Sequence, residues 1–359
     1  MSRRRVLRIV AVVLVLLLVW PTVSYARALT APGSATFTMR TVDWIRSNNG
    51  NSVVNAIENW WYTRHKPATG PPDVSTLPSA GTNAVPVVGP PTLPLLKGVA
   101  PLPGEGTWSA GRTGANGRPL IYTGFLRPDP QHLSIVAGVA WIRAAGTVTH
   151  LVAGTAQPGG AAWPGNAAVP DGDVGKLVAT FNSGFKMKDT PGGFYLNGRY
   201  ARQLVDGQAS LVIDRSGAVR IGAWGRDVSM SAAVVAVRQN LQLIVENGRP
   251  VSGLSGNANG RWGSPRNQYQ YTWRSGAGLD RSGNLIYVAG DKMTLSMLAT
   301  AMADAGVVRG MQLDIHTGMS SFASWRPPGT PTKLLPAMTR SASRYLQADQ
   351  RDFFYVTAG

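Results

Sequence analysis

The carboxylate best placed for chemistry in this 359-residue sequence is Asp314, which follows the apolar run Val307–Leu313. That run predicts a buried strand, and the polar segment Ile315–Ser321 predicts a loop. The end of a strand that is followed by such a loop often presents a functional side chain. His316 would share a face with Asp314 if the strand continued, as an acid–base or a metal-binding pair, but a pair alone specifies neither role. We predict that Asp314 is catalytic and that His316 and Ser320 contact the ligand.

A second group of candidates follows the apolar run Leu177–Phe181. Asn182 offers both a hydrogen-bond donor and an acceptor to a ligand, or it could instead satisfy a buried turn. Gly184 and Gly193 belong to a loop in which the backbone can approach a ligand closely. Lys186 could meet an anionic group, although exposed lysines usually have no specific role. These four residues are candidates for the site, and the residues alone leave both interpretations of Asn182 open.

Two arginines could bind an anion. Arg274 directly precedes a Gly-containing apolar run, and Arg238 lies in the segment Val237–Asn240. A guanidinium presents two donors that match two oxygens of a phosphate ester, and it could alternatively pair with a neighbouring carboxylate. Arg274 is the stronger candidate for this task, and Arg238 is the weaker one.

The elements that must position Asp314 can be predicted from the preceding forty residues. The apolar runs Ser275–Leu279 and Leu285–Ala289 are joined by Asp280–Gly283, which is typical of a β-hairpin turn. Thr294 can cap a helix with a regular apolar face, and Gly306 can end it. We therefore predict a hairpin, a helix and then the strand that carries Asp314.

Many hairpin signals and few helical ones characterise the rest of the body. Apolar runs separated by turn residues predict strands at Leu120–Leu126, Leu133–Trp141, Thr147–Gly154 and Leu177–Phe181. This pattern favours an α+β fold with a mostly antiparallel mixed sheet and few helices. The body is predicted to span residues 106–359.

The N-terminus is typical of an exported protein. Ser2–Arg8 is basic and Ile9–Ala26 is uncharged and mostly apolar. Residues 1–28 are predicted to be an export signal cleaved near Ala26–Ala28, or a retained transmembrane anchor. Both alternatives place the body outside the cytoplasm, either secreted or tethered to a membrane.

Residues 29–66 are predicted to be a juxtamembrane segment with two short helices, interrupted at Asn48–Asn51. In the second helix one face carries Val53, Ile57, Trp60 and Trp61. That face could dock onto the protein's own body, or the aromatic residues, including Tyr62, could lie at a membrane–water boundary. Residues 67–105 are rich in Pro and Gly and predict a linker.

The composition excludes several classes of function. The net charge is +17, but no basic cluster follows the N-terminus and no aromatic–basic motif is present, so we predict no nucleic-acid partner. A basic surface instead suits an anionic cell envelope. The chain has no cysteine, which excludes disulfides, thiolate metal sites and cysteine nucleophiles. Motifs for nucleotide cofactors and zinc hydrolases are also missing, and no cofactor or metal is predicted.

Three segments resemble the phosphodiester glycosidase family. They are WRSGAGLDRSGNLIYVAGDKMTLSMLATAMADAGVVRGMQLD at 273–314, ATFNSGFKMKDTPGGFYLNGR at 179–199 and LQLIVENGRP at 241–250. The resemblance implies a hydrolase that cleaves a sugar 1-phosphodiester. It implies three catalytic residues: Arg274 binds phosphate, Asn182 binds the sugar and Asp314 directs water.

The sequence departs from the family where Asp314 is followed by Ile315, His316 and Thr317 in place of a glycine run. This departure favours an alternative, in which a non-catalytic envelope protein with the same fold binds a glycan or phosphoglycan. Whether the chain is an enzyme is therefore open at this stage. In both cases the expected partner is a phosphate-bearing carbohydrate.

Overall fold

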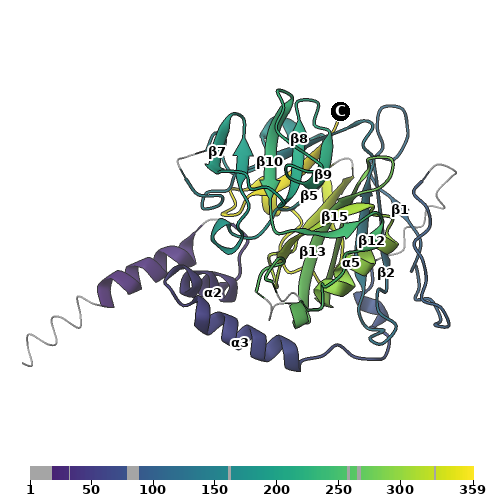
Figure 1. Ribbon diagram of the computed structural model, residues 1–359, viewed down its shortest axis with the longest axis horizontal. Helices are drawn as coiled ribbons and strands as arrows, with labels where there is room; N and C mark the ends of the chain where they lie inside the picture. Colours follow the sequence, from purple (N-terminus) through teal and green to yellow (C-terminus); the bar gives the residue numbers. More distant parts are fainter. Residues whose placement is uncertain are drawn as a thin grey trace, which may run out of the picture.

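The computed structural model describes residues 18–31, 33–78, 89–160, 163–256, 259–264, 268–326 and 329–359. Three β-sheets form the body, and helices lie mainly at the N-terminal side (Figure 1). Every pairing between the named strands is antiparallel, and a parallel contact occurs in the isolated bridge between Trp224 and Val228. The predicted α+β class with mostly antiparallel strands and few helices is thus confirmed.

The largest sheet contains the hairpin and the strand that the sequence analysis singled out. Its strands run in the order β1 (Ser109–Ala110), β2 (Ile121–Leu126), β3 (Ala137–Ile142), β14 (Leu285–Met293), β13 (Thr272–Leu279), β15 (Arg309–Ile315), β11 (Leu243–Glu246) and β12 (Arg249–Pro250).

Two five-stranded sheets complete the body. One has the order β7 (Arg199–Arg202), β6 (Phe194–Leu196), β10 (Val234–Gln239), β8 (Ala209–Asp214) and β9 (Val219–Ala223). The other has the order β17 (Thr330–Lys333), β16 (Phe322–Arg326), β5 (Leu177–Asn182), β18 (Phe353–Ala358) and β4 (Thr147–Val152).

Local chemistry explains the hairpin between β13 and β14. The Asp280 carboxylate accepts the backbone N–H groups of Ser282 and Asn284 at 2.8 and 2.9 Å. Gly283 adopts φ +81°, which glycine tolerates without a steric penalty. Both strands are longer than predicted because pairing with neighbouring strands extends them beyond their apolar runs.

The predicted helix is α5 (Leu295–Asp304), and it packs on one face of the largest sheet. Thr294 accepts the N–H of Met297 at 3.3 Å, and Gly306 follows the helix at φ +92°. Gly276 of β13 permits close packing here, because a Cβ at that position would lie 2.5 Å from the Met302 sulfur.

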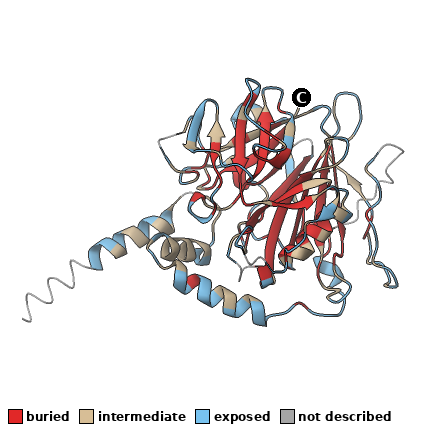
Figure 2. Ribbon diagram, in the orientation of Figure 1, coloured by how far each residue is buried: buried red, intermediate tan, exposed pale blue. Residues whose placement is uncertain are grey.

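The main core lies on the other face of the largest sheet. There, side chains from all three sheets form one buried cluster, which includes Tyr287, Leu313, Phe181, Phe354 and Leu211. In Figure 2 the buried residues are concentrated in the strands of the body, whereas the N-terminal helices are mostly exposed or half-buried.

The two predicted N-terminal helices are α2 (Phe37–Ser47) and α3 (Asn51–Arg64), and the break between them lies at Asn48–Gly50. An earlier helix is described over residues 18–30. The predicted membrane segment lies partly in residues 1–17, outside the described residues. No helix within the described ranges is both long enough and apolar enough to cross a bilayer.

Several other boundaries differ from the prediction. The strand expected from Leu133 begins at Ala137, because the preceding residues form a turn in which Ile135 N–H bonds the His132 carbonyl at 3.0 Å. The segment before β5 contains the single-turn helix α4 (Asp171–Val174). Short 3-10 turns are formed at η1 (Val74–Thr76), η2 (Met187–Asp189) and η4 (Arg344–Leu346).

Candidate functional site

A cavity of about 600 Å³ lies where the end of β15 meets α2 and α3. The body contributes the polar side chains Lys186, Asp189, Arg274, Gln312, Asp314, His316 and Arg351 to its lining. The helices contribute Asp43, Arg46, Asn55, Glu58 and Tyr62. We refer to this cavity as the site pocket.

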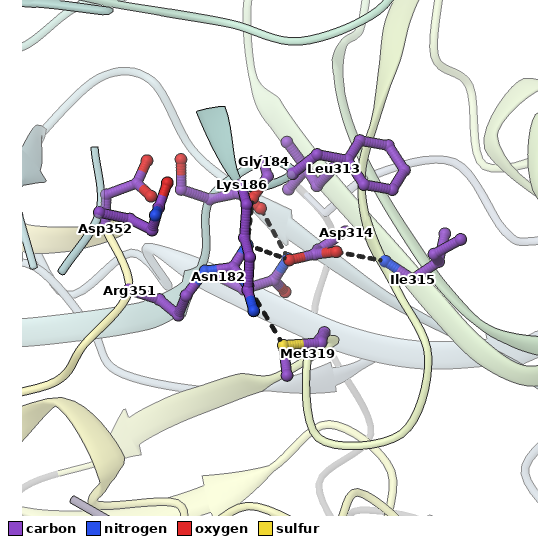
Figure 3. A network of polar contacts seen from close by, with 12 residues as sticks. Asn182, Gly184, Lys186, Leu313, Asp314, Ile315, Met319, Arg351 and Asp352 are labelled. Carbon is purple, nitrogen blue, oxygen red and sulfur yellow. Dashed lines mark hydrogen bonds and ion pairs between the residues drawn. The ribbon is translucent and has the colours of Figure 1, made fainter. Parts of the chain in front are cut away.

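Asp314 is the buried carboxylate of the site pocket, with 7 % of its surface exposed. One of its oxygens, Oδ2, accepts Arg351 Nη2 at 2.6 Å, and Oδ1 accepts the Ile315 N–H at 2.8 Å. Figure 3 shows Arg351 reaching from the C-terminal segment toward Asp314, while Gly184 O accepts the same guanidinium nitrogen at 3.0 Å. The pair thus joins three segments that are distant in sequence.

Burial dominates the acidity of Asp314. Desolvation raises the pKa of the carboxyl, while Arg351, the Ile315 N–H and Lys186 partly oppose that rise. The Arg351 pKa is raised in turn, because the carboxylates around it outweigh its own burial. A carboxylate of raised pKa is a better proton acceptor than an ordinary one.

Arg274 also lines the site pocket and is buried in β13. Its Nε donates to the Met293 carbonyl at 2.7 Å, and its Nη2 donates to the Gln270 carbonyl at 3.3 Å. Burial lowers the pKa of its guanidinium to about 9. At neutral pH the group therefore remains a cation.

His316 is held between the body and α3. Its Nδ1 lies 3.2 Å from the Thr272 hydroxyl, its Nε2 lies 3.4 Å from Glu58, and its ring stacks on Tyr62 at 5.5 Å. Burial, together with the smaller effects of the Arg46 and Arg274 charges, lowers the pKa of His316 to about 3. The imidazole is therefore neutral at physiological pH.

The backbone at His316 retains a feature of the missing glycine run. His316 adopts φ +76° and Gly318 adopts φ +78°, both in the left-handed region that favours glycine. The loop after Asp314 thus keeps a conformation suited to glycine at a position where the sequence has histidine.

Lys186 connects the site pocket to α2. Its ammonium group lies 2.6 Å from the Asp43 carboxylate, and both side chains are largely shielded from solvent. Because both line the cavity, the pair forms part of its wall.

Asn182 lies at the end of β5 but does not line the site pocket. Its carbonyl oxygen accepts the Tyr287 hydroxyl at 2.8 Å and the Ser321 N–H at 3.0 Å. Its amide donates to the Ser183 carbonyl and to the Ser275 hydroxyl at 2.9 and 3.1 Å. These contacts use the bonding capacity of the amide within the protein.

Arg238 is buried outside the pocket lining, and it pairs with Asp352 at 2.6 Å. Gly193 directly precedes β6, and its N–H donates to the side-chain oxygen of Gln239 at 2.8 Å. Gly184 and Ser320 do not line the cavity, but each bonds one member of the pair between Asp314 and Arg351. The Gly184 carbonyl accepts the Arg351 guanidinium, and the Ser320 hydroxyl donates to the Asp314 backbone carbonyl at 3.2 Å.

Of the sequence-predicted site residues, the structure thus brings Lys186, Arg274, Asp314 and His316 together in one cavity. Their roles, and those of the other candidates, stay predictions.

Sequence reasoning missed Arg351, Glu58 and Tyr62. The charged segment Asp349–Asp352, directly before the apolar strand β18, was the available signal for Arg351. No comparable signal marked Glu58 and Tyr62, because they lie on a helix far from the other site residues in sequence.

The site pocket combines a buried carboxylate with the cations Lys186, Arg274 and Arg351. Such an arrangement suits an anionic ligand that is held close to a proton acceptor. No cluster of three or more His, Asp or Glu side chains in the described part of the chain could hold a metal ion.

Comparison with known proteins supports the resemblance found in the sequence. Residues 175–320 match the family model of the phosphodiester glycosidases, which confirms the predicted resemblance. A search of curated proteins finds no match.

Two solved structures are similar at low identity. The catalytic domain of zebrafish N-acetylglucosamine-1-phosphodiester alpha-N-acetylglucosaminidase, auto-inhibited by its pro-peptide, has 15% identity and a TM-score of 0.46, covering 70% of this chain and 88% of that one. A hypothetical protein from Synechocystis has 14% identity and a TM-score of 0.41, covering 67% and 62%. At these values neither similarity adds to the assignment of function.

Proposed function

We propose that this protein is a hydrolase that cleaves a sugar 1-phosphodiester in the site pocket. The observation that carries the proposal is the placement of Asp314 in one cavity with the cations Lys186, Arg274 and Arg351. The match of residues 175–320 to the phosphodiester glycosidase family supports it independently.

In the proposed reaction the cations bind the phosphodiester and stabilise the phosphate that leaves. Water attacks the anomeric carbon as the bond from that carbon to the phosphate oxygen breaks. The bonding electron pair stays on the phosphate, and the proton of the attacking water passes to Asp314. The leaving phosphate monoester is already a stable anion, so a second carboxylic acid is not required to protonate it.

The proposal includes an extracytoplasmic location in the cell envelope. The basic segment Ser2–Arg8 and the apolar segment Ile9–Ala26 are its motivation, since they are typical of an export signal or a membrane anchor.

A non-catalytic role is the second candidate. Asp314 is already paired with Arg351, and the glycine run that follows the family's aspartate is replaced here. Both features would suit a protein that holds a phosphoglycan without cleaving it.

The deciding experiment uses the full-length protein, because α2 and α3 contribute to the pocket wall. Release of free sugar from a panel of sugar 1-phosphodiesters is measured for the wild type and for Asp314→Asn. Glu105→Gln is the matched control, since Glu105 is a buried carboxylate paired with Arg127 outside the pocket.

We expect turnover that Asp314→Asn reduces by at least about a thousandfold and Glu105→Gln leaves intact. In water enriched in heavy oxygen, the label should enter the sugar hydroxyl. Label in the phosphate product would show attack at phosphorus and contradict a glycosidase. Saturable binding without turnover, unchanged by Asp314→Asn, would establish the binding role.

A further inference from the structure

The polarity of α3 is reversed relative to an ordinary surface helix. Its outer face, formed by Val53, Ile57, Trp60 and Trp61, is 59 %, 60 %, 53 % and 48 % exposed. In Figure 2 the helix lies along the rim of the molecule and is largely exposed. A surface helix normally buries its apolar face against the body.

The polar side of α3 faces the protein instead. Asn55, Glu58 and Tyr62 line the site pocket, and Asn59 bonds Gln270 of the body. Tyr62 also stacks on His316. The inner face also buries Val54, and together with these polar contacts it fixes the helix so that the outer face is directed away from the body.

The chemistry of the outer face suits the interfacial region of a bilayer. Neighbouring tryptophans are favoured where a membrane meets water, because the ring is apolar and the indole N–H is polar. Transfer of these two rings and of the Val53 and Ile57 side chains out of water would favour the bound state.

Charge complementarity points to an anionic membrane. Arg64 lies over the Trp60 ring at 5.3 Å, and the exposed Lys66 follows the helix. Residues 18–66 contain five Lys and Arg against two Asp and Glu. Basic residues beside an apolar face attract anionic lipid headgroups.

The helix before α2 extends the apolar surface along the chain. Leu18, Val19, Trp20 and Val23 are all exposed on it. The sequence immediately before it, Ile9–Leu17, is entirely apolar. This continuity also favours a lipid surface over a soluble partner.

The site pocket itself has an apolar part. Met39 and Val42 of α2, together with Phe185, Leu241 and Met319 of the body, line it beside the charged groups. Such a lining suits a ligand with a polar, anionic end and an apolar end. Since α3 is about 10 Å across, the pocket would lie roughly one helix diameter from a bilayer touching the outer face.

We propose that the outer face of α3 lies in the interface of an anionic bilayer, and that the site pocket behind it takes a sugar phosphodiester whose alcohol is a lipid. The lipid portion of this proposal rests on the proposed function. The bilayer contact does not, because it depends on the outer face alone.

The bilayer contact is tested with a fluorescent label on the full-length protein. The chain has no cysteine, so Ile57→Cys provides a unique attachment point for an environment-sensitive dye. Tyr200→Cys, on an exposed position of β7, is the matched control. Vesicles of phosphatidylcholine, with and without phosphatidylglycerol, carry a quencher in their acyl chains.

With vesicles containing phosphatidylglycerol, we expect the fluorescence emission of the dye at position 57 to shift to shorter wavelength and to be quenched. The emission of the dye at position 200 should stay at the wavelength typical of water. An Ile57 label that remains in water would overturn the bilayer contact. A shift that occurs without vesicles and grows with protein concentration would also overturn it, because a second copy of the chain would then cover the face.

The lipid substrate is tested with two diesters that share one sugar, a soluble methyl diester and a long-chain diester in vesicles. The double variant Ile57→Ser/Trp60→Ser should slow hydrolysis of the long-chain diester about tenfold or more and leave the methyl diester unchanged. Tyr200→Ser/Val205→Ser is the control, because both residues are exposed on the body.

Equal hydrolysis of both diesters by the wild type, with no selective effect of the double variant, would overturn the lipid substrate. Failure of the wild type to cleave either diester would refute the proposed function. In that case the fluorescence of the dye at position 57 would still test whether α3 contacts the bilayer.

Discussion

At the scale of single residues, the electrostatics of the site pocket depend on the pair between Asp314 and Arg351. Burial raises the pKa of Asp314, and the guanidinium 2.6 Å away is the largest influence in the opposite direction. The pair therefore decides the pH at which the carboxylate becomes available as a proton acceptor.

We predict that Arg351→Gln moves the acidic limb of the pH–rate profile to higher pH, because the Asp314 pKa rises further when its cation is removed. The shift is measured in kcat/KM against pH. Arg351→Lys keeps the positive charge and should restore most of the original profile.

Arg127→Gln is the matched control, since Arg127 forms a buried pair with Glu105 away from the pocket. Losing either buried pair costs roughly 3–5 kcal/mol of stability, but Arg127→Gln should leave the pH dependence of kcat/KM unshifted. An unshifted profile for Arg351→Gln would contradict the role assigned to this pair.

His316 is predicted to make the fold less stable in acid. Its pKa is lowered to about 3 in the folded protein from an ordinary 6.5, so below pH 6.5 the unfolded chain binds a proton that the folded chain does not. Its stabilising contribution is complete above that pH and is lost as the pH falls toward 3.

Lowering the pH from 7 to 5 should cost about 2 kcal/mol of unfolding free energy through His316 alone. In His316→Asn this part of the pH dependence should disappear, and asparagine tolerates the φ of +76° found there. Chemical denaturation at pH 7 and pH 5 measures the unfolding free energy of each variant. His65→Asn, at the exposed end of α3, should retain the wild-type slope.

At the scale of elements, α5 positions the strand that bears Asp314. The helix buries Leu295, Leu298 and Met302 on the sheet that contains β13 and β15. The chain enters β15 within five residues of the end of α5, so disorder in the helix would be transmitted to that strand.

We predict that Thr294→Ala lowers stability by about 1 kcal/mol, because the first turn of α5 loses the side chain that accepts the Met297 N–H. Thermal unfolding measures the change. Thr294→Ser keeps the hydroxyl and should be close to the wild type. Equal destabilisation by both variants would show that the methyl group, rather than the cap, is responsible.

At the scale of the whole molecule, the excess of positive charge should favour capture of an anionic substrate. The net charge is +17, whereas the lining of the site pocket is balanced, with four basic side chains (Arg46, Lys186, Arg274 and Arg351) and four acidic ones (Asp43, Glu58, Asp189 and Asp314), so the attraction comes from the molecule as a whole. Long-range attraction of this kind is weakened by salt, since mobile ions screen charges beyond about 10 Å.

We predict that kcat/KM for a soluble sugar phosphodiester falls roughly tenfold from low to near-physiological ionic strength, while kcat changes little. Steady-state kinetics over a salt series measure both constants. A neutral phosphotriester analogue serves as the control in a competition assay, because its affinity should not follow salt. A kcat/KM that is independent of salt would contradict electrostatic capture.

Much of the architecture near the site follows from short-range patterns. The turn at Asp280–Gly283 and the cap at Thr294 each depend on residues a few positions apart, and both are found as predicted. The break between α2 and α3 is found at Asn48–Gly50, one residue shorter than the predicted Asn48–Asn51. The resemblance over residues 175–320 likewise follows from the order of local motifs. The sequence by itself therefore determined the antiparallel class of the body and the position of Asp314 at the end of a buried strand.

The surroundings of Asp314 were decided by tertiary structure. Arg351 reaches the carboxylate because β18 inserts between β5 and β4, and Glu58 and Tyr62 reach the pocket because α3 turns its polar face inward. Asn182 instead bonds Tyr287, which lies on β14 in another sheet, and Ser321, which directly precedes β16. These contacts join residues more than thirty positions apart, so they depend on strand register and helix orientation. Local periodicity and turn chemistry specify neither.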